Sequence, residues 1–149
     1  MKEKTSVTPV RYYVGDLCYV MHDVWNEVCD LIPFDNSEHE FELKDGRKFI
    51  LFGTAHGDGS YSDFAGNSYG VDSGTIGAIK VEDIHDLEGF NCTVNNGYGH
   101  VHEFPVEIDS FDCYYDGGVI NIYSVSIDTD PAGDSEYDED EDIVLGFLS

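Results

Sequence analysis

The apolar residues of this chain come in short runs that are separated by turns rich in Gly and Asp. Residues 48–54 and 119–127 are rich in β-branched and aromatic side chains, a composition typical of strands. Strong turn signals precede both runs, at positions 45–46 and 116–118. Short strands joined by tight turns predict a mainly antiparallel β-sheet.

One segment has the spacing of a helix instead. In residues 23–32 the apolar positions fall at i, i+3, i+4 and i+7, which places them on one stripe of an α-helix. Asp23 is suited to cap its N-terminus. The expected fold class is therefore α+β: mainly antiparallel β-sheet with one amphipathic helix near the N-terminus. The residues of the stripe are Trp25, Val28, Cys29 and Ile32.

Further strands are expected on both sides of the chain's midpoint. The pattern predicts strands at 17–21, 90–94, 100–108 and 111–115, the last three as parts of a meander. The apolar segment 143–148 is expected to return to the sheet as a last strand.

Length and composition predict a single domain. The chain has 149 residues and a hydrophobic fraction of 41%, with 10 Tyr, 9 Phe and 1 Trp. A chain of this length can bury one hydrophobic core without disulfides or metals. No Pro/Ser-rich linker and no internal repeat divides it, so residues 1–149 are expected to form one acidic α+β domain.

The charge of the chain is strongly negative and unevenly distributed. Seven Lys and Arg stand against 31 Asp and Glu, which gives a formal net charge of -24. Six of the seven basic residues lie in the first 48 positions, the seventh is Lys80, and residues 81–149 contain 18 acidic residues. Nucleic acids and anionic membranes are bound through Lys and Arg, so this composition argues against direct binding to either.

The carboxylates of the second half are the candidate partner-binding residues. Residues i and i+2 of a strand share one face about 6.6–6.8 Å apart, so alternating acids approximate a row of phosphates. On a strand over residues 100–109, Glu103, Glu107 and Asp109 would share one face, opposite apolar residues. Residues 128–142 are expected to form an acidic loop. The remaining candidates are Asp112, Asp116, Asp128, Asp130, Asp134, Glu136, Asp138, Glu139, Asp140, Glu141 and Asp142.

The size of the charge argues against a role in solubility alone. Acidic loops are often only solvated, but solubility of a small domain needs a net charge of roughly 2–8 in magnitude. A stretch of 69 residues without a cation also gives up ion pairs that would relieve self-repulsion. The pattern favours binding to a basic surface, and the commonest basic surfaces in a cell bind nucleic acid.

Three patterns could carry chemistry, and each is incomplete. His100 and His102 could chelate a metal from one strand face, but no third ligand is identifiable. The acidic segment 58–63 lacks the ligand pattern of a calcium loop. No catalytic residue, metal or cofactor is assigned, and enzyme activity stays a minor alternative. A hydrolase would need these residues to converge: Asp16, His56, Asp58 and Asp72.

The N-terminal sequence and the cysteines bear on the compartment. No apolar core of signal-peptide length follows the basic N-terminal residues. The four cysteines form no C-x-x-C pair, so they are expected to be reduced thiols. These features predict a cytoplasmic protein.

Three segments carry a resemblance to known sequences. They are 14–20 (VGDLCYV), 54–63 (TAHGDGSYSD) and 71–79 (VDSGTIGAI), with Trp25 in the helix after the first. Together they resemble a set of small, mostly uncharacterised proteins of bacteriophage and bacterial genomes, over roughly residues 10–85. The resemblance implies no activity and no catalytic residue. A phage origin would imply the host cytoplasm, and small acidic phage proteins resemble inhibitors of host or defence enzymes, some of which mimic DNA.

The leading hypothesis is therefore a phage-type inhibitor or counter-defence protein. It would bind a basic, nucleic-acid-binding surface of a host enzyme as a phosphate or DNA mimic, in a salt-sensitive way. One alternative is a protein-directed inhibitor or adaptor that uses its apolar surface and stays bound at high salt. The other is a small metal-dependent hydrolase that uses residues 56–77.

Overall fold

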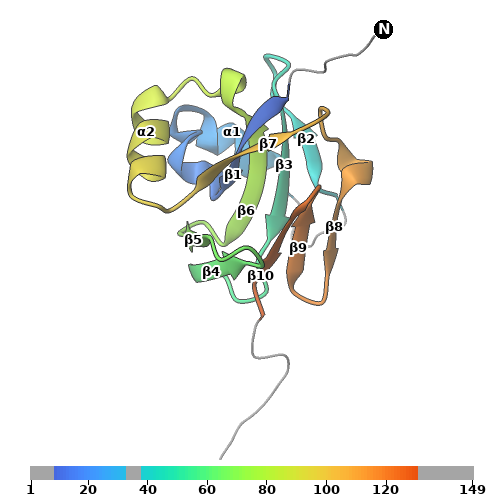
Figure 1. Cartoon of the computed structure of the whole chain (residues 1–149). Coiled ribbons are helices and arrows are strands. Elements are labelled where there is room, and N and C mark those ends of the chain that lie inside the picture. The colour runs from blue at the N-terminus through green and yellow to red at the C-terminus, as the bar shows by residue number, and fades with distance from the viewer. Residues whose placement is uncertain (1–8, 33–37, 131–149) are drawn as a thin grey trace, which may run out of the picture.

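Two five-stranded antiparallel sheets stack face to face, and helices cover the outer face of one of them (Figure 1). The computed structural model describes residues 9–32 and 38–130. The structure is mostly antiparallel β-sheet with a few short helices, so the expected α+β class and strand pairing are confirmed at this level.

Sheet A is the central layer of the molecule. Its strand order is β2-β3-β6-β1-β7, and every neighbouring pair is antiparallel. Its strands are β1 (Val10–Gly15), β2 (Glu40–Glu42), β3 (Lys48–Gly53), β6 (Thr75–Lys80) and β7 (His100–Phe104).

Sheet B packs against one face of sheet A. Its strand order is β5-β4-β10-β9-β8, again antiparallel throughout. Its strands are β4 (Gly59–Asp63), β5 (Ser68–Val71), β8 (Cys113–Asp116), β9 (Val119–Ile122) and β10 (Val125–Asp128).

Short helices lie over the other face of sheet A. The α-helices are α1 (Trp25–Leu31) and α2 (Leu87–Asn95). Four 3-10 helices complete the described elements. They are η1 (Leu17–Tyr19), η2 (His22–Val24), η3 (Val81–Asp83) and η4 (Ser110–Asp112), of which η4 adjoins β8 of sheet B instead.

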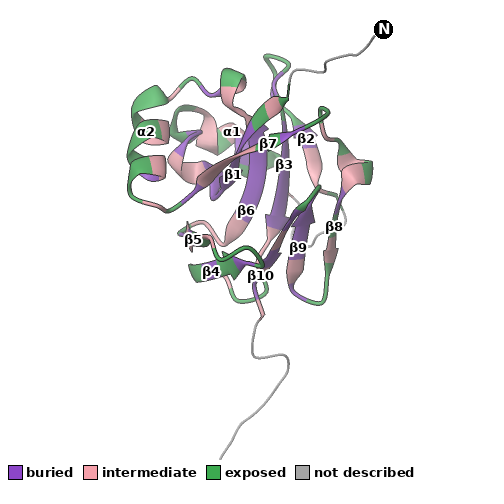
Figure 2. Ribbon diagram, viewed as in Figure 1, coloured by how far each residue is buried: buried purple, intermediate pink, exposed green. Residues whose placement is uncertain are grey.

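The central strands of sheet A, β1, β3 and β6, bury both of their faces, which creates two hydrophobic cores. On β1, Tyr12 and Val14 enter the core between the sheets, while Tyr13 enters the core under the helices. Neighbouring side chains of a strand point to opposite faces, so a continuous apolar run fits a strand buried on both sides. Figure 2 shows this central layer as a buried band between more exposed elements.

The helical segment at residues 23–32 is shorter than expected. It contains the 3-10 turn η2 and the seven-residue helix α1. Val28 of α1 is buried, but Cys29 of the expected stripe is exposed. The N-cap position is Val24, without a side-chain hydrogen bond, so the expected cap at Asp23 is wrong.

Two expected strands are helices. Residues 17–21 begin with η1, because the Asp16 side chain accepts the N–H of Cys18 and caps a helical turn. Residues 90–94 belong to α2, which Asp86 caps through the N–H of Gly89. Capping by Asp at a turn outweighed the β-branched composition that suggested strands.

Three other strand boundaries also differ from expectation. The strand expected at 100–108 ends at Phe104, and residues 111–115 begin in η4 before β8. The run 119–127 is not one strand but the hairpin β9–β10, which turns at Tyr123 with a φ of 54°. A positive φ is uncommon at a non-glycine residue such as Tyr123, so the sequence of residues 119–127 did not indicate this turn. The segment 143–148 lies outside the described residues.

Candidate functional site

The basic residues that the structure describes gather at one end of sheet A. They lie at the start of β1 and β3, in the turn between β2 and β3, and at the end of β6. We call this the cationic end. Its residues are Arg11, Lys44, Arg47, Lys48 and Lys80. The five strands of sheet B contain no Lys or Arg.

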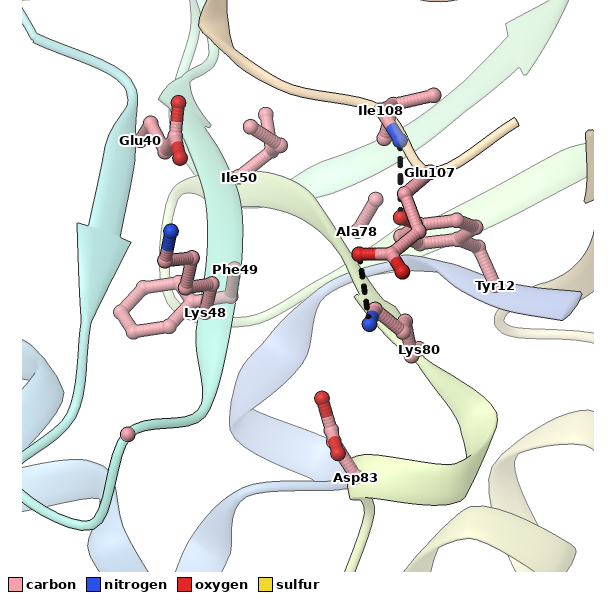
Figure 3. Close-up of a pocket in the computed structure, with 11 residues that line it drawn as sticks. Tyr12, Glu40, Lys48, Phe49, Ile50, Ala78, Lys80, Asp83, Glu107 and Ile108 are labelled. Carbon is pink, nitrogen blue, oxygen red and sulfur yellow. Dashed lines mark hydrogen bonds and ion pairs between the residues drawn. The ribbon is translucent and has the colours of Figure 1, made fainter. Parts of the chain in front are cut away.

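A pocket of about 250 Å³ opens at the cationic end, lined by residues of sheet A, η3 and the segment after β7 (Figure 3). The Lys80 ammonium lies 2.9 Å from the Glu107 carboxylate, and this contact raises the pKa of Lys80 and lowers that of Glu107. The Ile108 N–H donates to the Tyr12 hydroxyl at 3.0 Å. Burial raises the pKa of Tyr12. These contacts fix the segment after β7 over the pocket.

The charge of this pocket does not favour anions. Lys48 and Lys80 line it, but three carboxylates line it as well. The lining is therefore not net positive, and the cationic end is neutralised locally. The carboxylates are those of Glu40, Asp83 and Glu107.

The expected row of carboxylates on residues 100–109 does not form. Because β7 ends at Phe104, Glu107 and Asp109 do not share a strand face with Glu103. Glu103 pairs in register with Arg11 on β1. Two of the three candidates, Glu103 and Glu107, thus lie beside cations and not on a free anionic face.

Asp109 and Asp112 have a structural role. The Asp109 side chain accepts the N–H of Phe111 at 2.9 Å, and the Asp112 side chain accepts the N–H of Asp109 at 3.0 Å. Together they form a capping box around η4. Their carboxylates hold this turn, with Phe111 at its centre 94% exposed.

Three other candidate residues lie at the end of sheet B that is far from the cationic end. Asp116 and Asp128 both lie across from Val119 of β9, so β9 runs between them. Asp130 follows β10, and its carboxylate is 2.8 Å from His56 Nε2. We call Asp116, Asp128 and Asp130 the acidic end. The other candidates lie outside the described residues: Asp134, Glu136, Asp138, Glu139, Asp140, Glu141 and Asp142.

The two histidines of β7 contact sheet B. His100 Nε2 lies 2.7 Å from the carbonyl of Ser68, and His102 Nε2 lies 3.0 Å from the hydroxyl of Tyr69. Both imidazoles are therefore engaged in the link between the sheets. In residues 9–32 and 38–130, no group of three or more His, Cys, Asp or Glu is arranged to hold a metal ion.

Tyr69 is the centre of a buried polar network. Its hydroxyl donates to Asp63 Oδ2 at 2.7 Å, so the Tyr69 oxygen accepts from the Nε2–H of His102. Burial and the bond to Asp63 raise the pKa of Tyr69 far above its ordinary value. Burial raises the pKa of Asp63, but hydrogen bonds including those from Asn67 and Tyr69 outweigh it and leave the pKa lowered. Burial lowers the pKa of His102.

Asp16 joins segments that are far apart in the sequence. Its fully buried carboxylate accepts the N–H groups of Cys18, Asp72 and Ser73 at 2.7–2.9 Å, as well as the Ser73 hydroxyl. The Thr54 N–H donates to the carbonyl of Gly74 at 2.9 Å. The segments 14–20, 54–63 and 71–79 therefore meet at one place.

The convergence required for a hydrolase is only partial. Asp16 lies against the backbone of Asp72, but its oxygens are occupied by hydrogen bonds. His56 lies beside Asp130, a residue that the sequence did not connect with it. Asp58 and Asp72 line a common hollow, without His56 or Asp16.

Two adjoining hollows form a groove beside this junction. One, of about 540 Å³, is lined by residues of β4, β5 and the loop after α2. The other, of about 850 Å³, lies between η1–α1 and α2. They meet at Tyr19 and Asp72, which line both. We call the pair the aromatic groove, because it is also lined by Trp25 and Tyr98.

Sequence reasoning missed the aromatic groove. Its aromatic residues come from three separate segments, and no spacing rule connects them. Burial raises the pKa of Tyr19, and the nearby carboxylate of Asp72 raises it further. The sequence pointed to this region only through the hydrolase alternative, which grouped Asp16 with Asp72, a residue that lines the groove.

The four cysteines are free. Cys113 is buried in the core between the sheets, and burial raises its pKa to about 12. Burial also raises the pKa of Cys18. Cys29 and Cys92 are exposed.

No protein-family model, curated protein or solved structure matches this chain. The resemblance to phage and bacterial proteins therefore stays a prediction. Within the described part of the chain, no helix combines the length and apolarity that crossing a membrane requires.

Proposed function

We propose that the protein is a non-enzymatic inhibitor that binds a basic, nucleic-acid-binding surface of another protein, as a phosphate mimic. The observation that carries this proposal is the separation of charge. The described Lys and Arg residues lie at the cationic end of sheet A, whereas Asp116, Asp128 and Asp130 form the acidic end of sheet B.

The acidic end is continuous with the most acidic part of the sequence. Asp130 is directly followed by residues 131–149, which contain seven further acids and no cation. Such a concentration of charge steers a basic partner toward one end of the molecule and speeds association. The same attraction is screened by salt, because the Debye length shortens to about 3 Å at 1 M.

The test is competition between the protein and DNA for the same partner. The immobilised protein is incubated with a nuclease-treated bacterial lysate, and the bound proteins are challenged with a duplex DNA oligonucleotide. We expect DNA to displace a bound nucleic-acid enzyme, and high salt to release it. A captured protein that resists both DNA and salt would contradict the proposal, as would the capture of no DNA-binding protein.

Paired charge variants locate the binding surface. Asp116→Asn with Asp128→Asn is expected to weaken capture, because both side chains belong to the acidic end. Glu42→Gln with Glu82→Gln makes the same change in charge beside the cationic end and is the matched control. Equal losses in the two double variants would mean that only net charge matters.

The charge of the segment after the acidic end is tested separately. Neutralising residues 138–142 as Asn and Gln removes five charges without touching the described residues. We expect weaker capture at low salt and an unchanged unfolding transition. Wild-type capture by this variant would remove the segment from the binding surface.

Phe111 supports a second candidate function, docking through an apolar surface. Its side chain is 94% exposed, while the backbone around it is held by the capping box and by Glu40, which accepts the N–H of Ser110. An ordered, exposed aromatic residue is a common interface anchor. If capture survives 1 M NaCl and is lost in Phe111→Ser, this second function replaces the first.

A further inference from the structure

The aromatic groove combines aromatic walls with an acidic rim. The rings of Tyr19 and Tyr98 lie 6.0 Å apart at an interplanar angle of 30°. Trp25 lines the neighbouring hollow, and Tyr19 belongs to both. Flat π-surfaces of this kind attract cations through their ring quadrupoles.

Tyr98 is held in place although it is half exposed. The Gly70 N–H donates to the carbonyl of Tyr98 at 2.9 Å. A Cβ at Gly70 would lie 3.1 Å from the Tyr98 ring, so the absence of a side chain lets the ring lie close to β5. The ring is therefore presented at the groove by backbone contacts, with 50% of the residue's surface open to solvent.

The rim of the groove is negative. Among the described residues that line it, none is Lys or Arg. Asp72 lines both hollows, which places one acid between them. The remaining acids surround the hollows from three different segments. The acidic lining residues are Asp23, Asp58, Asp72, Asp86 and Glu88.

We propose that the aromatic groove binds arginine side chains carried on a basic segment of a partner protein. This inference rests on the proposed function and names the chemistry by which the basic partner is recognised. A guanidinium group stacks on aromatic rings and forms bidentate hydrogen bonds with carboxylates. The groove offers both kinds of contact, and its larger hollow of about 850 Å³ has room for such a side chain.

Arginine fits this groove better than lysine does. Lysine carries a compact, strongly hydrated charge and cannot use the rings as a stacking surface to the same extent. The acidic end, in contrast, is defined by three carboxylates alone: Asp116, Asp128 and Asp130. The acidic end would attract any cation, whereas the groove selects the planar one.

Trp25 provides the readout, because it is the only tryptophan in the chain and lines the groove. The full-length protein is titrated with acetyl-Arg-Gly-Arg-amide, and separately with acetyl-Lys-Gly-Lys-amide, at equal ionic strength. We expect a saturable change of Trp25 emission with the arginine peptide and affinity about two- to fivefold lower with the lysine peptide. Equal affinities would overturn the proposal.

Matched variants assign the binding to the groove. Tyr98→Ala removes an exposed ring, and Leu87→Ala removes an exposed apolar side chain that lines neither hollow. Asp23→Asn with Glu88→Gln removes two of the five rim charges, and Asp116→Asn with Asp128→Asn is its control of equal charge. We expect the groove variants to lose about two- to fivefold in affinity for the arginine peptide. If the controls lose as much, the groove is not the site.

The same variants separate this inference from the proposed function. If DNA displaces the captured partner but groove variants capture it normally, the proposed function stands and the groove inference fails. If the arginine peptide binds in the groove but DNA never displaces the partner, the groove inference stands and the phosphate-mimic function fails.

Discussion

Sheet A and sheet B are built from similar numbers of residues but are used differently. Sheet A lies between two cores, and β3 buries four consecutive side chains from Phe49 to Phe52. Sheet B faces a core on one side only, and β4 alternates exposed Ser60 and Ser62 with buried Tyr61. The basic residues within strands all belong to sheet A.

This difference separates the parts of the molecule that maintain the fold from those available for contact. A strand buried on both faces can change only at the cost of a cavity or a clash. The outer face of sheet B carries exposed side chains such as Ser60, Ser62 and Tyr114 and ends at acidic residues, so its sequence is free to serve binding. Stability should therefore depend on sheet A, and partner affinity on sheet B and its surroundings.

The largest expected effect is the loss of a sheet A side chain. Phe49→Ala should lower the free energy of unfolding by about 3–5 kcal/mol, because it leaves a cavity in the core under the helices. Urea denaturation measures this change. Phe111→Ala removes the same ring from an exposed position and should cost less than about 0.5 kcal/mol. Similar losses in the two variants would contradict the division of roles.

Asp16 is expected to have the next largest effect. Asp16→Asn replaces an acceptor oxygen with an amide NH₂ that faces backbone N–H donors. The free energy of unfolding should therefore fall by about 2–3 kcal/mol. Asp116→Asn at an exposed position is the control and should leave stability unchanged within about 0.5 kcal/mol. Equal stabilities would show that the Asp16 junction does not hold the loops together.

The polar link between the sheets should have an intermediate effect. Tyr69→Phe removes the hydroxyl that contacts Asp63 and His102, and should cost about 1–3 kcal/mol because both partners lose a buried hydrogen bond. Urea denaturation of Tyr61→Phe, which removes a hydroxyl bonded to the Gly57 carbonyl beside the surface, provides a comparison. We expect the smaller loss in the Tyr61 variant.

Protonation of His102 should make stability depend on pH. Burial lowers its pKa in the folded state, against the attraction of Asp63 and together with the repulsion of His100. The unfolded chain therefore binds more protons as pH falls below about 6.5, so this contribution to stability is complete above that pH and is lost below it. Between pH 7.5 and 5.5, the wild type should lose more stability than His102→Gln. Parallel pH profiles would contradict this assignment.

The smallest effect is expected on the outer face of sheet B. Ser62→Ala changes an exposed side chain of β4 and should alter stability by less than about 0.5 kcal/mol. Thermal unfolding followed by circular dichroism measures it. A larger loss would mean that this face is covered by another part of the molecule and is not available for contact.

The sequence predicted strands well where turn chemistry was explicit. The turn at 116–118 separates β8 from β9 as expected, and residues 48–54 contain β3. The prediction from the sequence was wrong where helix capping or an unusual backbone conformation decided the structure. Asp86 started a helix in a segment with strand-like composition, and Tyr123 made a turn without glycine. Both depend on local hydrogen bonding and packing that composition does not record.

The candidate site was predicted in charge but not in place. The half of the chain after Lys80, which contains no Lys or Arg, supplies α2 and β7 as well as β8, β9 and β10. The expected row of Glu103, Glu107 and Asp109 was wrong, because β7 ends before Glu107. A one-dimensional pattern cannot tell which acids will meet a cation across a sheet, as Glu107 meets Lys80.

The sequence by itself determined the antiparallel β character, the single strongly acidic chain and the uneven charge along it. These follow from residue type and short-range spacing, which act before any distant contact forms. Only the tertiary structure decided that sheet A lies between two cores, that the described Lys and Arg residues gather at one end of sheet A, and that Tyr19, Trp25 and Tyr98 share one groove. Those outcomes depend on strand order and on contacts such as Asp16 with Asp72, which lie 56 residues apart.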